Sequence, residues 1–429
     1  MNGHVYPRYE RYKDSGVEWL GEIPVHWKQQ RLKWLAPLHL RKAGEEDAAR
    51  PYVGLENAQS WTGRYMRSEA TEQTTGDSVL FEPSHLLFGK LRPYLAKALK
   101  PGFSGRCTGE FLVLSPSEVS RDFLHAVLLS DPFVRTVDSS TFGTKMPRAD
   151  WHFVGNMPIP LPPDAEQSAI AAFLDRETAK IDALIEKQER LIERLEEKRK
   201  ALISHAVTQG LNPNVKMKES GVEWMGRIPE HWSVERNRWL FRERDDRSTD
   251  GSEELLTVSH ITGVTPRAEK DVFMFLAETN EGYKRCRPGD LVINTMWAWM
   301  GALGVSAYAG IVSPSYNVYV PVCQGEARFF DYLYRTPAFI NEIIRWSKGV
   351  WSSRLRLYPT EFLNVRTALP PVDEQREIVA HLDEESHRVE SMIGKVGLLI
   401  EKLREKRTAL ISAAVTGKIR ISDATGDEP

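Results

Sequence analysis

Two histidines and two glutamates recur in register along the chain and are its first candidates for chemistry. His26 and His231 each stand two residues after a proline and one before a tryptophan, and Glu166 and Glu374 each follow a Leu-Pro-Pro turn. Each histidine lacks a second ligand at metal spacing in the sequence. The glutamates fall in the first turn of predicted helices, where a carboxylate interacts favourably with the helix dipole and can accept hydrogen bonds from free amides. We therefore expect the histidines to tie the N-terminal segments in place and the glutamates to cap helices, rather than to act as general bases.

The sequence lacks the common catalytic signatures. It holds no phosphate-binding G-x-x-x-x-G-K-[ST] loop, no G-x-G-x-x-G after a strand, no H-E-x-x-H and no G-x-S-x-G. Cys107, Cys286 and Cys323 form no pair at metal-ligand or disulfide spacing, which predicts reduced, incidental thiols in a cytoplasmic protein. We expect no catalytic residue and no metal site on this chain. An enzyme with an unfamiliar site stays open as an alternative.

Length, charge and hydropathy limit the classes of protein that remain possible. A chain of 429 residues predicts two to four compact units. No apolar run approaches 18 residues, so no membrane span is expected, and the first residues lead into charged sequence without the apolar core of a secretory signal. The formal net charge is −2, so a surface that binds nucleic acid would have to be a local basic patch.

The sequence repeats itself. The segment 15–27, SGVEWLGEIPVHW, returns at 220–232 as SGVEWMGRIPEHW, with ten of thirteen positions identical. Leu-Pro-Pro followed by Glu-Gln occurs at 161–167 and again at 369–375, and Glu-Lys-Arg-x-Ala-Leu-Ile-Ser ends both halves. Two similar halves of about 205 residues therefore make up nearly the whole chain. Between the matching ends the apolar pattern survives while polar and basic residues change, which indicates one scaffold with two surfaces, although drift after duplication would also change them.

Each half ends in a segment with the pattern of a long coiled-coil helix. Residues 165–208 contain no Gly or Pro, and Ile181, Gln188, Leu195 and Leu202 recur every seven residues. At this length the helix would span ~66 Å, longer than a globular domain requires. The second copy, 373–416, carries a matching stripe but also Gly394 and Gly397, each costing roughly 1 kcal/mol relative to Ala. We expect the two helices to pack against each other, antiparallel if the halves are related by a pseudo-two-fold axis. The alternative is that each folds back on its own domain.

The globular parts indicate an α+β fold. The segments 78–81, 111–114, 291–293 and 317–320 are predicted strands, and 123–129 and 329–334 are predicted helices that stop near Pro132 and Pro337. We expect a pseudo-two-fold repeat in which two similar globular domains are joined by an antiparallel coiled coil. The predicted divisions are a first domain at 1–164, a first helix at 165–212, a second domain at 213–372, and a second helix with the tail at 373–429.

The repeated opening, the Leu-Pro-Pro entry to a charged helix and the helix ending together resemble the specificity subunits of type I restriction-modification systems. The resemblance covers both halves of the chain. It implies that each globular domain is a target-recognition domain for one half of a bipartite, asymmetric double-stranded DNA sequence. It also implies that the helices set the spacing and dock two methyltransferase subunits, with two restriction/translocase subunits completing the assembly. S-adenosylmethionine, ATP and magnesium would then be bound by those partners, with no cofactor on this chain.

Given that resemblance, we predict DNA contacts in two divergent loops of each domain. Arg and Lys suit guanine edges or phosphates, and Asn suits adenine. The predicted DNA-binding residues are Lys90, Arg92, Tyr94, Lys145 and Arg148 in the first domain, and Asn294, Thr295, Lys348, Arg354 and Arg356 in the second. A solvated basic loop is the alternative for any one of them, and core or partner-facing positions are the alternative for Trp297 and Trp299. The predicted partner-docking residues on the helices are Leu184, Leu191, Leu195, Leu202, Met392, Leu399, Leu403 and Leu410.

A different class of protein would share the repeat and the helices. A coiled-coil scaffold that binds two protein partners without reading DNA needs the same long apolar stripes. The two hypotheses separate on whether the chain retains a bipartite duplex selectively.

Overall fold

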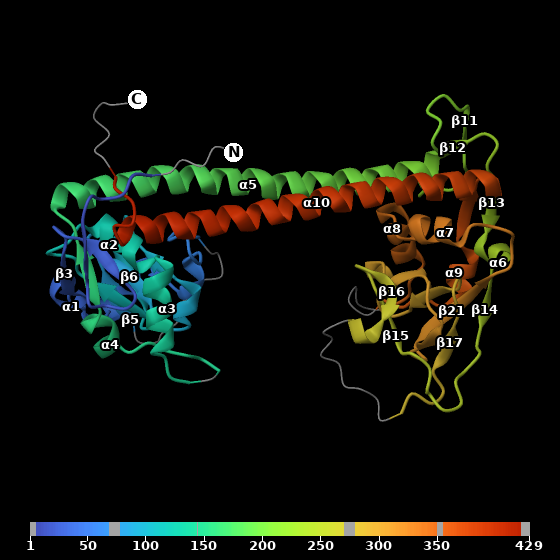
Figure 1. The fold of residues 1–429 in the computed structure, drawn as a ribbon. Coiled ribbons are helices and arrows are strands. Elements are labelled where there is room, and N and C mark those ends of the chain that lie inside the picture. Colours follow the sequence, from blue (N-terminus) through green and yellow to red (C-terminus); the bar gives the residue numbers. More distant parts are fainter. Residues whose placement is uncertain (1–5, 68–77, 144, 270–278, 350–354, 422–429) are drawn as a thin grey trace. The chain divides into compact units, whose positions relative to one another are not determined.

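The computed structural model describes residues 6–67, 78–143, 145–269, 279–349 and 355–421. The chain divides into two compact units, coloured along the sequence in Figure 1. Unit 1 comprises residues 1–189 and 397–429, and unit 2 comprises residues 190–396. Two long helices, α5 (Asp164–Gln209) and α10 (Val372–Val415), are each shared between the units. Each unit therefore combines a globular α+β part with one portion of each helix, whereas the predicted four-part division by sequence order stays a prediction.

Unit 1 is built from short strands and helices. Its strands are β1 (Tyr12–Asp14), β2 (Glu22–Pro24), β3 (Lys28–Arg31), β4 (Tyr52–Val53), β5 (Ser78–Phe81), β6 (Leu86–Gly89), β7 (Ala98–Leu99), β8 (Gly105–Thr108), β9 (Phe111–Leu114) and β10 (Pro158–Leu161). Its helices are α1 (Leu32–Leu35), α2 (Arg121–Leu128), α3 (Asp131–Ser139), α4 (Trp151–Asn156) and the first part of α5, with short 3-10 turns η1 (Glu45–Asp47), η2 (Leu55–Asn57) and η3 (Pro93–Leu95). The strands form two three-stranded sheets, β4-β8-β5 and β7-β6-β9, and the pairs β1-β2 and β10-β3.

The sheet β7-β6-β9 of unit 1 is covered on both faces. Successive strand residues point to opposite faces, so Leu86 and Phe88 of β6 join the core formed with the helices, while Leu87 joins a second core on the other side. Strand β9 divides in the same way, with Phe111 on the second face and Leu112 on the first. A sheet buried on both faces is a rigid base for the loops at its edges.

Unit 2 repeats this plan with a larger central sheet. Its strands are β11 (Met217–Glu219), β12 (Arg227–Pro229), β13 (Ser233–Arg236), β14 (Phe241–Arg244), β15 (Leu256–Ser259), β16 (Gly263–Pro266), β17 (Lys284–Cys286), β18 (Leu291–Asn294), β19 (Leu303–Val305), β20 (Gly310–Val312), β21 (Tyr316–Pro321) and β22 (Arg366–Leu369). Its helices are α6 (Asn237–Leu240), α7 (Ala327–Tyr334), α8 (Pro337–Trp346), α9 (Pro359–Asn364) and the first part of α10, with 3-10 turns η4 (Arg267–Glu269) and η5 (Ala298–Met300). The central sheet has the order β14-β21-β18-β19, and β18 alternates between two cores as β6 does.

The two long helices pack together within each unit. In unit 1, Ile181 of α5 shares a core with Leu410 and Ile411 of α10. In unit 2, Ala206 and Val207 of α5 share a core with Ile378 and Leu382 of α10. Each unit thus pairs the start of one helix with the end of the other, which is the antiparallel arrangement expected from the repeat. The α+β fold with two packed long helices is confirmed.

The recurring His, Trp and Glu residues anchor the start of each long helix. In unit 1, Glu166 Oε1 lies 2.6 Å from His26 Nε2, and Glu166 Oε2 accepts from Trp27 Nε1 at 2.9 Å and from the Tyr9 hydroxyl at 2.9 Å. In unit 2, Glu374 Oε2 lies 2.7 Å from His231 Nε2. The structural role expected for the histidines is confirmed. The carboxylates, however, accept from side chains of the N-terminal segments rather than from free helix amides, so the capping interpretation was wrong.

The glutamine beside each anchoring glutamate makes a second repeated contact. Gln167 accepts from the Ser120 backbone N–H at 2.7 Å and donates to the Pro162 carbonyl at 2.9 Å. Gln375 makes the same two bonds in unit 2, to Glu326 and Pro370, both at 2.9 Å. The Glu-Gln pair of the repeated motif therefore fastens each globular part to the first turn of a long helix.

Candidate nucleic-acid interface

The two loops predicted to contact DNA in unit 1 are hydrogen-bonded to each other. After β6, the Arg92 N–H donates to the Pro147 carbonyl at 2.8 Å, and the Ala149 N–H donates to the Lys90 carbonyl at 2.9 Å. Leu91 also forms a β-bridge with Arg148. The structure therefore brings Lys90, Arg92 and Arg148 into one cluster, although some fifty residues separate them in the chain.

The turn after β6 has an unusual backbone. Arg92 has φ 51° and Ala96 has φ 46°, both in the left-handed region that non-glycine residues rarely adopt. The turn η3 lies between them, and the Arg92 and Tyr94 side chains are exposed. In unit 2 the position of Ala96 is taken by Gly301, with φ 88°. Backbone strain of this kind persists where the surrounding structure holds it, often at binding loops.

Arg148 is held by a carboxylate that sequence reasoning missed. Its Nε donates to Glu110 Oε2 at 3.1 Å and its Nη2 donates to Glu110 Oε1 at 3.0 Å. Hydrogen bonding to Glu110 raises the pKa of Arg148 above its ordinary value, so the guanidinium stays charged. Glu110 lies on the turn before β9, and its carbonyl accepts from the Lys90 N–H at 2.9 Å. In the sequence, Glu110 stands out only as the residue directly before the predicted strand 111–114.

The equivalent loops of unit 2 meet in the same way but carry other side chains. The Leu357 N–H donates to the Thr295 carbonyl at 3.1 Å, and Lys348 and Arg356 exchange two backbone bonds of 2.9 Å. The Lys348 ammonium forms an ion pair with Glu361, and the Arg356 side chain is exposed. The predicted contact Arg354 lies outside the described residues.

Asn294 and the two tryptophans occupy unequal positions in this turn. Asn294 is 5% exposed, and its Oδ1 accepts from the Met296 N–H at 3.3 Å, so in this conformation its amide shapes the turn. Trp297 and Trp299 stack with centroids 6.2 Å apart and planes at 16°. Trp297 is half-exposed, and Trp299 donates its indole N–H to the Met296 carbonyl at 2.9 Å. Unit 2 therefore presents an aromatic and polar turn where unit 1 presents a basic one.

Apolar side chains remain exposed along the helix pair of each unit. In unit 1, Leu184 of α5 is 40% exposed and Leu398 of α10 is 60% exposed. In unit 2, Leu191 of α5 is 41% exposed and Met392 of α10 is 39% exposed. The remaining predicted docking residues are more buried: Leu195, Leu202, Leu399, Leu403 and Leu410. If the two helices buried their apolar stripes completely against each other, these side chains would be covered. Because they are exposed, the helix pair presents apolar surface to solvent in both units.

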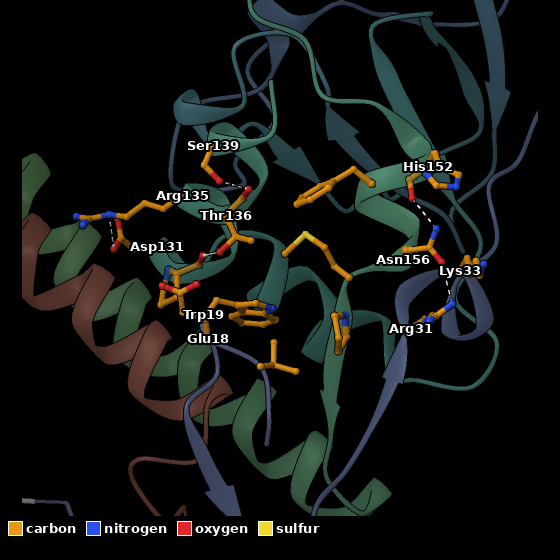
Figure 2. Close-up of a pocket in the computed structure, with 15 residues that line it drawn as sticks. Glu18, Trp19, Arg31, Lys33, Asp131, Arg135, Thr136, Ser139, His152 and Asn156 are labelled. Atoms are coloured by element: carbon orange, nitrogen blue, oxygen red, sulfur yellow. Dashed lines mark hydrogen bonds and ion pairs between the residues drawn. The ribbon is translucent and has the colours of Figure 1, made fainter. Parts of the chain in front are cut away.

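An open groove of about 1100 Å³ lies in unit 1 (Figure 2). Figure 2 shows Asp131, Arg135, Thr136 and Ser139 on one side, and Arg31, Lys33, His152 and Asn156 on the other, with Trp19 between. Arg31 donates to Asn156 Oδ1 at 3.2 Å, and Arg135 pairs with Asp131 at 2.9 Å. The groove holds part of the repeated motif, but none of the predicted DNA-binding residues lines it.

The described residues also bear on metal binding, thiol chemistry and membrane insertion. Among these residues no group of three or more His, Cys, Asp or Glu side chains is arranged to hold a metal ion. All three cysteines are free thiols, and burial raises the pKa of Cys107 to about 12 and that of Cys286 to about 11. No helix in the described part of the chain combines the length and the apolar character needed to cross a bilayer.

Comparisons with known proteins agree on one class. No protein-family model matches the chain. Over 154 residues it is 23% identical to the type I restriction enzyme EcoDI specificity subunit of Escherichia coli, a match that covers 35% of this chain and only about a third (34%) of the relative's length. Its fold is similar to a chain from a structure of type I restriction-modification complex assembly, with a TM-score of 0.63 and 20% identity. It is also similar to the HsdS subunit of Thermoanaerobacter tengcongensis, with a TM-score of 0.51 and 19% identity.

Both structural matches cover 92% of this chain and 98% of the other. The fold is that of the specificity subunits of type I restriction-modification systems. The chain resembles these subunits in sequence as well as in fold, which confirms the resemblance predicted from its repeated motifs.

Proposed function

We propose that this chain is the DNA sequence-recognition subunit of a type I restriction-modification complex, without catalytic activity of its own. Unit 1 and unit 2 each read one half of a bipartite, asymmetric duplex target. The helices α5 and α10 set the spacing between the half-sites and dock methyltransferase subunits. Restriction/translocase subunits complete the assembly in the cytoplasm. The partner subunits, not this chain, bind S-adenosylmethionine, ATP and magnesium.

One observation carries the proposal: the same strand-and-turn scaffold presents different side chains in the two units. The strands β6 and β18 are equivalent, and each leads into a turn that is hydrogen-bonded to a second predicted loop. That turn carries Lys90, Arg92 and Tyr94 in unit 1, and Thr295, Trp297 and Trp299 in unit 2. Sequence is read by side chains at base edges, so two unlike loops on one scaffold suit two unlike half-sites.

The exposed apolar side chains on the helices support the docking of partners. Leu184 in unit 1 and Leu191 in unit 2 lie on the coiled-coil stripe yet remain two-fifths exposed. Partner helices packed along the pair would bury these side chains, as in a four-helix bundle. A protein–protein scaffold that does not read DNA would use the same surface, which makes it the rival hypothesis.

Duplex binding by the full chain with its methyltransferase subunits tests the proposal. A gel shift uses a pool of random duplexes, followed by the selected duplex and a scrambled one. We expect selective retention of a duplex with a bipartite sequence. Arg148→Ala should weaken the base preference in one half-site, and Arg356→Ala should weaken it in the other. Equal retention of the selected and scrambled duplexes, with intact methyltransferase binding, would favour the scaffold hypothesis.

A further inference from the structure

We infer that the half-site read by unit 1 contains a guanine contacted by Arg148, and that Glu110 is the positioning residue for this contact. The inference rests on the proposed DNA-recognition function and deepens it by naming a base and the residue that orients its reader. The inference depends on which edge of the Arg148 guanidinium Glu110 binds, because that choice leaves another hydrogen-bonding edge free.

Glu110 binds the side edge of the Arg148 guanidinium. The two bonds run from Nε at 3.1 Å and from Nη2 at 3.0 Å. A guanidinium carries five N–H donors in one plane, of which this arrangement uses one on Nε and one on Nη2. Of the three remaining donors, one N–H of Nη1 lies on the Cδ side, and the other N–H of Nη1 and the second of Nη2 together form the end edge of the guanidinium. That edge has the fork geometry that pairs with O6 and N7 of guanine in the major groove.

Both residues of the pair have a fixed backbone. Arg148 exchanges backbone bonds with Phe142 at 3.3 and 3.4 Å, and bridges to Leu91. Glu110 is held through its carbonyl by the Lys90 N–H. The Arg148 side chain is half-exposed, so the free edge is open to solvent, whereas Glu110 is more covered. Ordering the arginine before binding lowers the entropy lost when it meets a base.

Charge distinguishes Arg148 from its neighbours. The carboxylate of Glu110 offsets the charge of the guanidinium, so the pair gains less from a phosphate than a free cation would. The remaining N–H donors of Arg148 are directional, which suits hydrogen bonding to the edge of a base. Arg92 and Lys145, both exposed, provide the cations for backbone phosphates in the same loops.

A second bidentate pair, in unit 2, supplies a matched control. Arg345 donates to Glu223 through Nη1 at 2.7 Å and through Nη2 at 2.8 Å, so the outer edge of its guanidinium is already used. Arg345 therefore lacks the free Nη1–Nη2 edge that Arg148 keeps, and it lies on α8, outside the predicted DNA-contact loops, so it should read no base. The position of Glu110 is occupied in unit 2 by Ser315, so the guanine contact is assigned to unit 1 alone.

The test measures base discrimination by the full chain with its methyltransferase subunits. A selection from random duplexes gives the bipartite target, and binding is then measured to that duplex and to every single-base-pair variant of it. We expect Arg148→Ala to reduce discrimination by about 5- to 150-fold at one G·C pair of one half-site. Glu110→Gln should reduce it about ten-fold at the same pair, and Glu110→Asp should restore part of it, because the charge-assisted bond returns. Arg345→Ala should change no position by more than about two-fold.

Discrimination is the ratio of the affinities of one protein sample for two duplexes. A lower fraction of folded protein changes both affinities equally and leaves this ratio unchanged. If Arg148→Ala does not fold, Arg148→Lys keeps the charge but loses the fork, and should lose discrimination while keeping its affinity for random duplexes. A wild-type complex without sequence preference would defeat the proposed function itself. A wild-type preference with equal weakening of all duplexes by the Arg148 variants would assign Arg148 to phosphate and overturn the guanine contact. Full discrimination in Glu110→Gln would overturn the positioning role.

Discussion

Arg407 and Asp182 form an ion pair between the two long helices in unit 1, with Nε 2.9 Å from Oδ1 and exposures of only 8% and 10%. Arg407 also donates to the Trp61 carbonyl at 2.7 Å, which fastens a loop of the globular part to the helix pair. The equivalent pair in unit 2, Arg199 and Glu390, has the same 2.9 Å separation but exposures of 32% and 60%. One repeated Glu-Lys-Arg motif therefore makes a buried bond in one unit and a surface bond in the other.

Burial predicts unequal costs for removing these two arginines. Arg407→Ala should lower the free energy of unfolding by about 1.5–3 kcal/mol, because it removes the short bond to the buried Asp182, which keeps only Arg64 at 3.6 Å. Arg199→Ala should cost about 0–1 kcal/mol, because the exposed pair is screened by water. Urea unfolding followed by circular dichroism measures both. Equal losses in the two variants would show that burial does not set the strength of these pairs.

Glu166 should make stability depend on acid pH. Burial acts to raise the pKa of Glu166, but hydrogen bonds from Trp27, His26 and Tyr9 outweigh it and lower the pKa below the ordinary 4.5. Its contribution to stability is therefore present above pH 4.5 and is lost as the pH falls through the lowered value. Glu166→Gln should be less stable than the wild type at pH 7, and the difference should narrow below pH 4.5. Melting curves across pH 3–7 measure it, and a constant difference would contradict the assignment.

Exposed leucines on the helices should be needed for partner binding but not for folding. Leu184→Ser and Leu191→Ser should each weaken methyltransferase binding about ten-fold, as expected for an apolar side chain buried in an interface. Their helical circular dichroism should stay unchanged, because both side chains are two-fifths exposed in the chain alone. Lys187→Ser, at an exposed position of the same helix, is the control. Pull-down with titrated methyltransferase gives the affinities, and unchanged binding in both leucine variants would place the docking surface elsewhere.

Exchange of one globular part should change one half-site. Replacing residues 28–160 with the equivalent segment of another specificity subunit should alter the bases selected in one half of the target and leave the other half intact. The reason is that the predicted contacts of unit 1 lie on loops supported by a sheet of the same unit. Selection from random duplexes reads both halves together. A simultaneous change in both half-sites would refute the assignment of one unit to one half-site.

Helix length should control the spacing of the target. A heptad inserted at equivalent positions of α5 and α10 keeps the seam in register, because seven residues return the stripe to the same face. It lengthens each helix by ~10 Å, about three base pairs of B-form DNA. The selected target should therefore gain about three base pairs between unchanged half-sites. An unchanged spacing would count against the helices as a ruler.

Local patterns in the sequence were sufficient for the repeat, the two long helices and the main strands. The seven-residue stripe without Gly or Pro predicted a helix at 165–208, and α5 runs Asp164–Gln209. The four predicted strands correspond to β5, β9, β18 and β21. These features depend on residues close in sequence, because helix and strand periodicity is a property of neighbouring side chains.

Only the tertiary structure decided which distant side chains meet. Glu166 bonds to His26 and Trp27 from some 140 positions away, and Glu110 accepts two hydrogen bonds from Arg148 across two loops. Whether Asn294 is buried, or Arg407 more covered than Arg199, depends on how sheets and helices pack around each position. Sequence spacing carries no record of such contacts, since a hydrogen bond needs two groups within about 3 Å whatever their separation along the chain.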